Sequence, residues 1–207
     1  MKGILKSLSQ FVVAAAIVVS LQSCCSSSGE VSREDSVIDA IMTRSSVRSY
    51  TSQAVEEEKI ETMLRAAMAA PTAGNKQPWE FVVINDRAIL DALPQIATGM
   101  KMAPKAPLAI AVCGVTALTF PNIPDYWVQD CSAATQNILL AAHAMGLGAV
   151  WCGAYPDGDT GRVARINELL NVPDGVHVLS VIIIGYPDSE PQPKDKWKPE
   201  RVRYNKF

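Results

Sequence analysis

Basic and hydroxyl side chains crowd together over residues 44–48, which read RSSVR. In an extended segment, Arg44, Ser46 and Arg48 point to one side and Ser45 to the other, because successive side chains alternate. A guanidinium group is a fork of hydrogen-bond donors, and serine adds a hydroxyl donor, so the run suits a phosphate group. The same residues are equally typical of a solvated basic turn, and the spacing alone leaves both interpretations open.

A second polar cluster occupies residues 71–79, with the sequence PTAGNKQPW. Two prolines and a glycine favour a loop of fixed shape, and the amides of Asn75 and Gln77 can each donate and accept hydrogen bonds. Such a loop suits the edge of a heterocycle, although an ordinary turn explains the residues about as well.

Glycines are concentrated in residues 146–153, GLGAVWCG. The segment contains G-x-G, but Trp151 takes the last glycine position of the G-x-G-x-x-G fingerprint. It also follows a predicted helix and opens a predicted strand, the reverse of the order in dinucleotide-binding folds. We therefore exclude a classical dinucleotide-binding fold here.

Charged residues dominate the C-terminal tail, where residues 191–207 hold six basic and two acidic side chains. Taken alone, the tail is typical of a solvated charged face. It is too polar for a core, so we expect it to lie along a surface or across a partner.

Hydrophobic periodicity predicts the elements that must position these segments. Helices are expected near 36–44, 56–70, 87–97, 126–145 and 161–170, and strands near 80–85, 108–114, 149–152 and 177–184. Their alternation favours a three-layer α/β or α+β domain. The 126–145 helix is apolar on most sides, which is typical of a buried or interface helix.

Composition narrows the class of protein. The 207 residues are 48% hydrophobic and 19% charged with a net charge of −2, which favours one globular domain and excludes a basic nucleic-acid-binding footprint. Two histidines, far apart, do not suggest a metal site. Cys113, Cys131 and Cys152 lie in apolar stretches and are expected to be buried thiols.

Taken together and in this order, the segments resemble the nitroreductase family of flavin enzymes from about Asp35 to the C-terminus. The matching text is RSSVRSY at 44–50, PTAGNKQPWEFVVI at 71–84, DCSAATQNILLAAHAMGLGAVWCG at 130–153, and IIIGYP with its basic tail from 182. The resemblance implies an α+β three-layer sandwich with a mixed, mostly antiparallel sheet flanked by helices. It also implies an intertwined homodimer with two FMN sites at the interface, which would include the 126–145 helix.

The resemblance also assigns cofactor-binding roles. The FMN phosphate, ribityl chain and pyrimidine edge would be held by Arg44, Ser45, Ser46 and Arg48, and the ribityl chain or flavin ring by Asn75. Backbone donors near flavin N5 would come from Trp151, Cys152 and Gly153. A basic pair at the phosphate would be Lys194 and Lys196, with Arg201 as a replacement for the second.

The implied activity is ping-pong electron transfer from NAD(P)H through FMN to a small acceptor such as a nitroaromatic or a quinone. Flavin carries the redox chemistry, so no catalytic side chain and no metal ligand is expected. Arg48 is the candidate cation for the negative charge of reduced flavin. The alternative is an exported flavin-binding lipoprotein that carries electrons or flavin with little catalysis.

The N-terminus suggests export. Residues 1–23 combine Lys2 and Lys6 with an apolar run at 11–21, about 16 Å as a helix, which suits a signal peptide better than a membrane span. The following LQSC resembles a lipoprotein box that would place a lipid anchor on Cys24. We therefore expect a signal peptide at 1–23, a tether at 24–33, and an FMN-binding domain at 34–207. The expected location is the cell envelope, or the cytoplasm if the signal is not used.

Overall fold

The computed structural model describes residues 33–158 and 160–207. The predicted signal peptide and Cys24 lie outside the described residues, as does nearly all of the predicted tether. Residues Arg33–Phe207 form one compact unit. Within the described residues, no helix combines the length and apolar character needed to cross a membrane.

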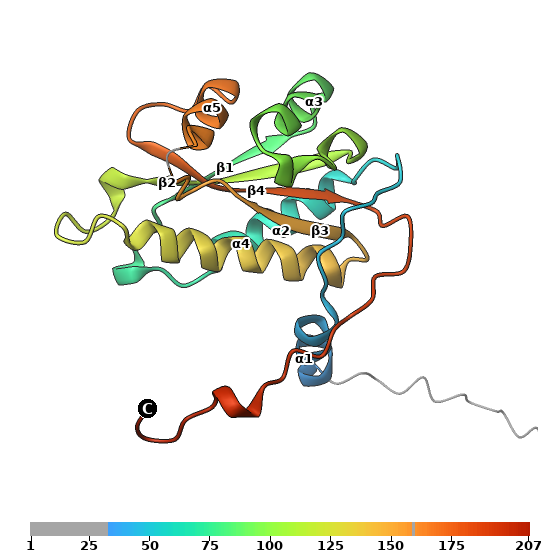
Figure 1. Ribbon diagram of the computed structural model, residues 1–207, viewed down its shortest axis with the longest axis vertical. Coiled ribbons are helices and arrows are strands. Elements are labelled where there is room, and N and C mark those ends of the chain that lie inside the picture. Colours follow the sequence, from blue (N-terminus) through green and yellow to red (C-terminus); the bar gives the residue numbers. More distant parts are fainter. Residues whose placement is uncertain (1–32, 159) are drawn as a thin grey trace, which may run out of the picture. The chain divides into compact units, whose positions relative to one another are not determined.

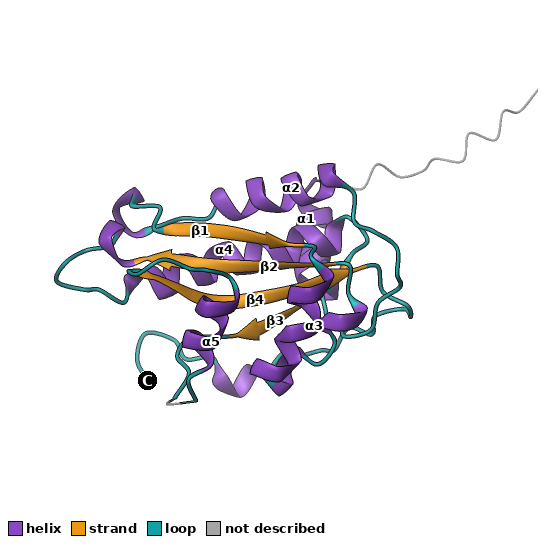
Figure 2. Cartoon of the chain, turned by 90° about the horizontal axis from the view of Figure 1, so that it is seen from above, coloured by secondary structure: helices purple, strands orange, loops and turns teal. Residues whose placement is uncertain are grey.

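Four strands form the sheet at the centre of this unit, in the order β1 (Trp79–Ile84), β2 (Leu108–Val115), β4 (Val176–Gly185) and β3 (Gly148–Gly153) (Figure 2). Every neighbouring pair is antiparallel. A single parallel bridge joins Ser46 to Ala149 at the outer edge of β3. The expected α+β class with a mostly antiparallel sheet is thereby confirmed.

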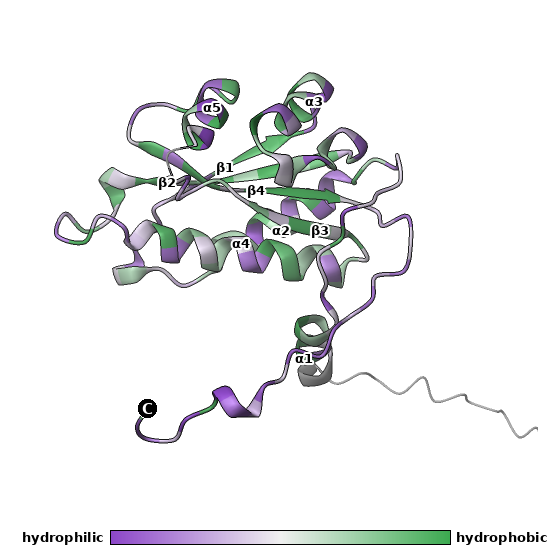
Figure 3. Ribbon diagram, viewed as in Figure 1, coloured by the Kyte–Doolittle hydropathy of each residue, from purple (hydrophilic) through white to green (hydrophobic). Residues whose placement is uncertain are grey.

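Helices cover both faces of the sheet (Figure 1). On one face lie α2 (Glu57–Met68) and α4 (Tyr126–Ala144), and on the other lie α3 (Arg87–Ile96) and α5 (Arg162–Leu169). The strands alternate between the two cores, so that Ile182 packs toward α4 while Ile183 packs toward α3 and α5. Figure 3 shows the hydrophobic residues concentrated along the strands, as this two-sided burial requires. The three-layer prediction is confirmed.

Helix α1 (Arg33–Thr43) and helix α4 each differ from what their composition suggests. The predicted apolar face of α1 is exposed, and Met42 leaves 66% of its surface accessible. Helix α4 buries a single stripe at helical spacing rather than all of its sides, running from Trp127 through Ala134 to Ala142. Its small residues bring it close to the sheet, and the opposite side stays half-buried or exposed.

Candidate functional site

Two segments from opposite ends of the described chain line one cavity of about 510 Å³. Residues 44–49 form one wall, and residues between 189 and 196 form the other. The cavity brings together six predicted site residues: Arg44, Ser45, Ser46, Arg48, Lys194 and Lys196. Four positive charges and four serines line the cavity, against a single carboxylate from Glu190. The arrangement suits a doubly charged anion such as a phosphate monoester.

The end of α1 sets where the first wall begins. The Thr43 hydroxyl donates to the Asp39 carbonyl oxygen at 2.7 Å, and its oxygen also lies 2.7 Å from His143 Nε2. A hydroxyl has one proton to donate, so the imidazole Nε2–H must be the donor in the second contact. This bond ties α1 to α4 directly before Arg44.

The first wall then runs along the outer edge of β3. The Val47 N–H donates to the Ala149 carbonyl oxygen at 3.1 Å, beside the Ser46–Ala149 bridge. A Cβ at Gly148 would lie 2.6 Å from the Val47 side chain, so only glycine permits this approach. The edge strand therefore holds the arginine–serine run by backbone contacts and leaves its polar side chains available to the cavity.

Tyr50 fastens the other end of the run. Its buried hydroxyl lies 2.6 Å from the Val47 carbonyl oxygen and 3.0 Å from that of Ile183. Burial raises the pKa of this phenol well above its ordinary value, so it remains a neutral donor.

The second wall follows directly from the end of β4. The Thr51 N–H donates to the Tyr186 carbonyl oxygen at 2.9 Å, and the Asp188 N–H donates to the Ser49 carbonyl oxygen at 3.4 Å. The Ser49 hydroxyl donates to the Asp188 carboxylate. These bonds pair the two chain segments just before they separate to form the cavity.

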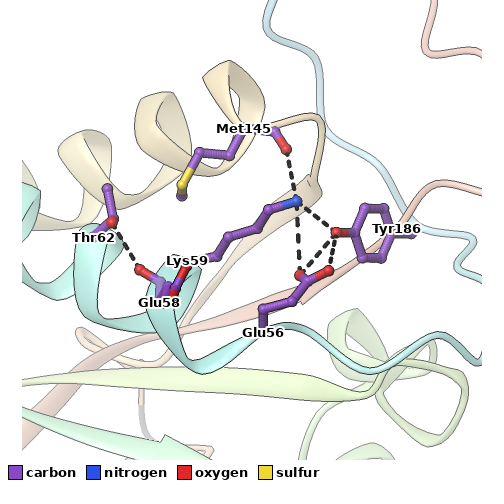
Figure 4. Close-up of polar contacts among 6 residues, drawn as sticks. All are labelled: Glu56, Glu58, Lys59, Thr62, Met145 and Tyr186. Carbon is purple, nitrogen blue, oxygen red and sulfur yellow. Dashed lines mark hydrogen bonds and ion pairs between the residues drawn. The ribbon is translucent and has the colours of Figure 1, made fainter.

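A polar cluster of Glu56, Lys59 and Tyr186 fixes the point where β4 ends (Figure 4). Lys59 Nζ donates to the Tyr186 hydroxyl at 2.5 Å and to the Met145 carbonyl oxygen at 3.3 Å, and Tyr186 donates to the Glu56 carboxylate at 2.8 Å. The backbone N–H of Glu56 and the Tyr186 hydroxyl hold the pKa of the Glu56 carboxyl below its ordinary value. The same hydroxyl raises the pKa of Lys59. The cluster thus joins the start of α2, the end of α4 and the end of β4.

Trp151, Cys152 and Gly153 lie on β3 outside the cavity lining. Because the Ala149 carbonyl faces away from β4 and strand groups alternate, the N–H groups of Trp151 and Gly153 also face outward. The N–H of Cys152 faces β4, and its buried thiol donates to the Gly99 carbonyl oxygen at 3.2 Å. Burial raises the pKa of this thiol to about 11, so it is a protonated core residue.

Asn75 also lies outside the cavity lining, in the short 3₁₀ turn Ala73–Asn75. Its Oδ1 accepts a bond from Gln77 Nε2 at 3.2 Å, which leaves Nδ2 to act as a donor toward a ligand. Arg201 lies in the turn Pro199–Arg201 and does not line the cavity, whereas Lys196 does.

Some residues near the site were not predicted from the sequence. Ser49, Ser189 and Gln192 line the cavity, but nothing in their spacing marks them, because they reach it only through the pairing of residue 49 with residue 188. Asp130 on α4 is buried behind the Asn75 turn. An acidic residue within an apolar helical stripe was the available signal.

Comparison with known proteins now decides the family. The model of the Nitroreductase family matches residues 41–117 and 102–186. The protein belongs to the nitroreductase family.

Relatives of this nitroreductase cover almost the whole described unit. A Methanothermobacter thermautotrophicus protein with the provisional name NADH dehydrogenase/NAD(P)H nitroreductase is 45% identical over 179 residues, covering 86% of this chain and 91% of the relative. A crystal structure of a protein of the same name from Bacteroides thetaiotaomicron is 46% identical, with a TM-score of 0.77 over 83% of this chain and 98% of its own. A nitroreductase from Desulfovibrio desulfuricans, solved in complex with FMN, is 30% identical with a TM-score of 0.71, covering 83% of this chain and 97% of its own.

The Glu56 cluster predicts a dependence of stability on pH. Because the pKa of Glu56 is lowered in the folded chain, its ionised form contributes stability above the ordinary carboxyl pKa, and that stability is lost as the pH falls through the lowered value. Glu56→Gln should therefore lower the urea denaturation midpoint at pH 7, and the difference from the unaltered protein should shrink toward pH 3. Glu61→Gln is the matched control, since it alters only an exposed ion pair with Arg65 on the same helix and should change the midpoint little. A Glu56→Gln difference that stays constant over this pH range would contradict the assignment.

Proposed function

We propose that this nitroreductase passes electrons from a reduced nicotinamide to a small acceptor, such as a nitroaromatic or a quinone, by ping-pong turnover. It is an FMN-dependent NAD(P)H oxidoreductase, in keeping with relatives named FMN reductase and NADPH-flavin oxidoreductase. Bound FMN supplies the redox chemistry, accepting electrons from the donor and giving them to the acceptor. The chain's own residues bind and orient the cofactor.

The observation that carries this proposal is the cationic cavity between residues 44–49 and the tail. A phosphate monoester carries nearly two negative charges at neutral pH, and two arginines with two lysines can neutralise it. Ser45 and Ser46 add hydroxyl donors within the same lining. The residues therefore fit the phosphate end of FMN.

Residues beyond the cavity would orient the flavin ring. The outward N–H groups of Trp151 and Gly153 continue along the same strand edge that holds Val47. Asn75 would add a side-chain donor. We assign no general acid or base among these residues, and the protonated thiol of Cys152 makes it a packing residue.

A homodimer completes the proposal. Apolar side chains remain exposed on α1, including Ile38 and Met42, and on the tail, including Trp197 and Tyr204. Exposed apolar groups gathered on α1 and on the C-terminal tail are typical of an association surface, and the family resemblance implies a second copy as the partner.

Light scattering should find a dimer when FMN is bound, and a stable FMN-bound monomer would contradict this.

Arg44→Ala should weaken FMN binding by about one to two powers of ten, because charge-assisted hydrogen bonds contribute roughly 1.5–3 kcal/mol each. Fluorescence titration of the FMN-free protein measures the dissociation constant. Arg65→Ala is the matched control, since this exposed arginine pairs with Glu61 outside the cavity. If Arg44→Ala binds FMN as tightly as the unaltered protein, Arg44 is not a phosphate ligand.

Turnover separates an enzyme from a carrier. We expect the FMN-loaded protein to oxidise NADH or NADPH with a quinone or nitroaromatic acceptor, and to give parallel lines in double-reciprocal plots, as ping-pong turnover requires. A protein that binds FMN but oxidises neither nicotinamide would instead be a flavin or electron carrier.

We also propose that the chain is exported and anchored through Cys24, from the order of charged, apolar and LQSC segments in the leader. Multiple acyl chains are needed for stable anchoring. Cys24→Ala should abolish labelling by a radioactive fatty acid, and Cys25→Ala should not. Unlabelled protein that retains residues 1–23 in the cytoplasm would contradict export and would place the enzyme beside an ordinary nicotinamide pool.

A further inference from the structure

Asp130 is a buried carboxylate that the redox proposal does not use. Only 5% of its surface is accessible, and it lies in the stripe of α4 that packs against the sheet. Its Oδ1 accepts a hydrogen bond from the Ala73 N–H at 3.0 Å. No donor among the described residues reaches Oδ2. Acidic residues are rarely buried in this way, because an incompletely paired carboxylate is costly to remove from water.

The turn that Asp130 contacts has an unfavourable backbone. Asn75 has φ 53° and Gln77 has φ 49°, both in the left-handed region. Asparagine tolerates this region, but for Gln77 it costs on the order of 1–3 kcal/mol and persists only where the surroundings enforce it. The turn must therefore be held by contacts beyond its own preferences.

Bonds within the turn set its shape but do not set its place in the fold. The Asn75 N–H donates to the Thr72 carbonyl oxygen at 3.1 Å, and the Gln77 N–H donates to the Thr72 hydroxyl at 3.2 Å. Within the part of the chain that the structure describes, the bond from Ala73 to Asp130 is the one hydrogen bond that joins residues 72–77 to another element.

A packing contact holds the turn at its next residue. Gly74 has φ 58°, and a Cβ there would lie 2.8 Å from Phe120 Cζ. The Phe120 ring also lies 5.3 Å from Lys76 Nζ. Phe120 belongs to the loop before α4, so the turn lies between this ring and the Asp130 carboxylate of the helix itself.

We propose that Asp130 is a positioning residue that fixes the Asn75 amide for its contact with the flavin. The carboxylate anchors Ala73 to helix α4. Asn75 lies two residues after Ala73 in the same turn, so this anchor also sets the position of its amide, whose Nδ2 is available as a donor. The inference rests on the proposed function, because it takes Asn75 to be a flavin ligand. The positioning role gives a reason for the burial of Asp130, which packing alone would disfavour.

A double-mutant cycle on the full-length protein tests this proposal, with the FMN dissociation constant as the readout. Asp130→Ala should raise the constant about tenfold, because the Ala73 N–H loses its partner. In an Asn75→Ala background, Asp130→Ala should cause almost no further rise, since its effect passes through Asn75. Asp130→Asn, which keeps an oxygen acceptor, should restore most of the affinity.

Asn137→Ala is the matched control on the same helix. Asn137 Nδ2 donates to the Ala66 carbonyl oxygen at 2.8 Å and so joins α4 to α2 rather than to the turn. This variant should lower the denaturation midpoint but bind FMN normally. If Asp130→Ala behaves in the same way, or if its effect adds fully to that of Asn75→Ala, the positioning role is wrong.

A variant at the other end of the bond keeps the test decisive if Asp130→Ala does not fold. Ala73→Pro removes the donated N–H at the first position of the turn, where proline is well tolerated. It should weaken FMN binding to a similar degree, and native affinity would overturn the proposal.

If the unaltered protein binds no FMN, the proposed function itself fails. If it binds FMN and only Asn75→Ala weakens the binding, the inference about Asp130 fails alone.

Discussion

The outer edge of β3 is the constraint on which the site depends. An edge strand presents backbone N–H and C=O groups that must be covered or otherwise used. Here one part of the outer edge of β3 pairs with residues 44–48, and the next part directs its backbone N–H groups away from the sheet. Ala149 accepts the bond that lays residues 44–48 beside the sheet, while Trp151 and Gly153 keep their N–H groups directed outward. The arginine–serine run and the outward N–H groups of Trp151 and Gly153 therefore follow one another along a single strand edge.

The positive charge of the cavity results from the pairing of two distant segments. The C-terminal tail carries several lysines and arginines that are exposed to solvent. Because water and salt screen exposed charges, each of them alone contributes little to binding an anion. Pairing of residues 49–51 with residues 186–188 directs Lys194 and Lys196 toward Arg44 and Arg48. The cluster around Tyr186 then anchors this pairing to α2 and α4 (Figure 4). The charge in the cavity thus depends on half-buried and exposed contacts outside it.

The sequence predicts the regular elements well because their signals are long and periodic. The strand expected at 177–184 is β4 (Val176–Gly185), and the helix expected at 126–145 is α4 (Tyr126–Ala144). The 3₁₀ turns Thr98–Met100 and Ala103–Lys105 were not predicted, since a single turn has no periodicity to detect. An apolar composition also did not distinguish the buried stripe of α4 from its half-buried sides.

In the candidate site, residues grouped closely in the sequence were predictable, whereas residues brought in by folding were not. Arg44, Ser46 and Arg48 are grouped within a few positions, so their common wall was predictable. The contributions of Gln192 and Asp130 depend on chain pairing and on helix burial, which are properties of the folded chain. A carboxylate in a helix is ordinarily solvated, so the burial of Asp130 and its contact with the Ala73 N–H emerge only in the folded chain.

In the proposed function, the cavity between residues 44–49 and the tail recognises the phosphate of FMN. Titration of the FMN-free protein with FMN and with riboflavin, which lacks only that phosphate, tests it most directly. We expect FMN to bind at least about 100-fold more tightly than riboflavin, because several charge-assisted hydrogen bonds depend on the phosphate. Equal affinity for the two flavins would contradict it.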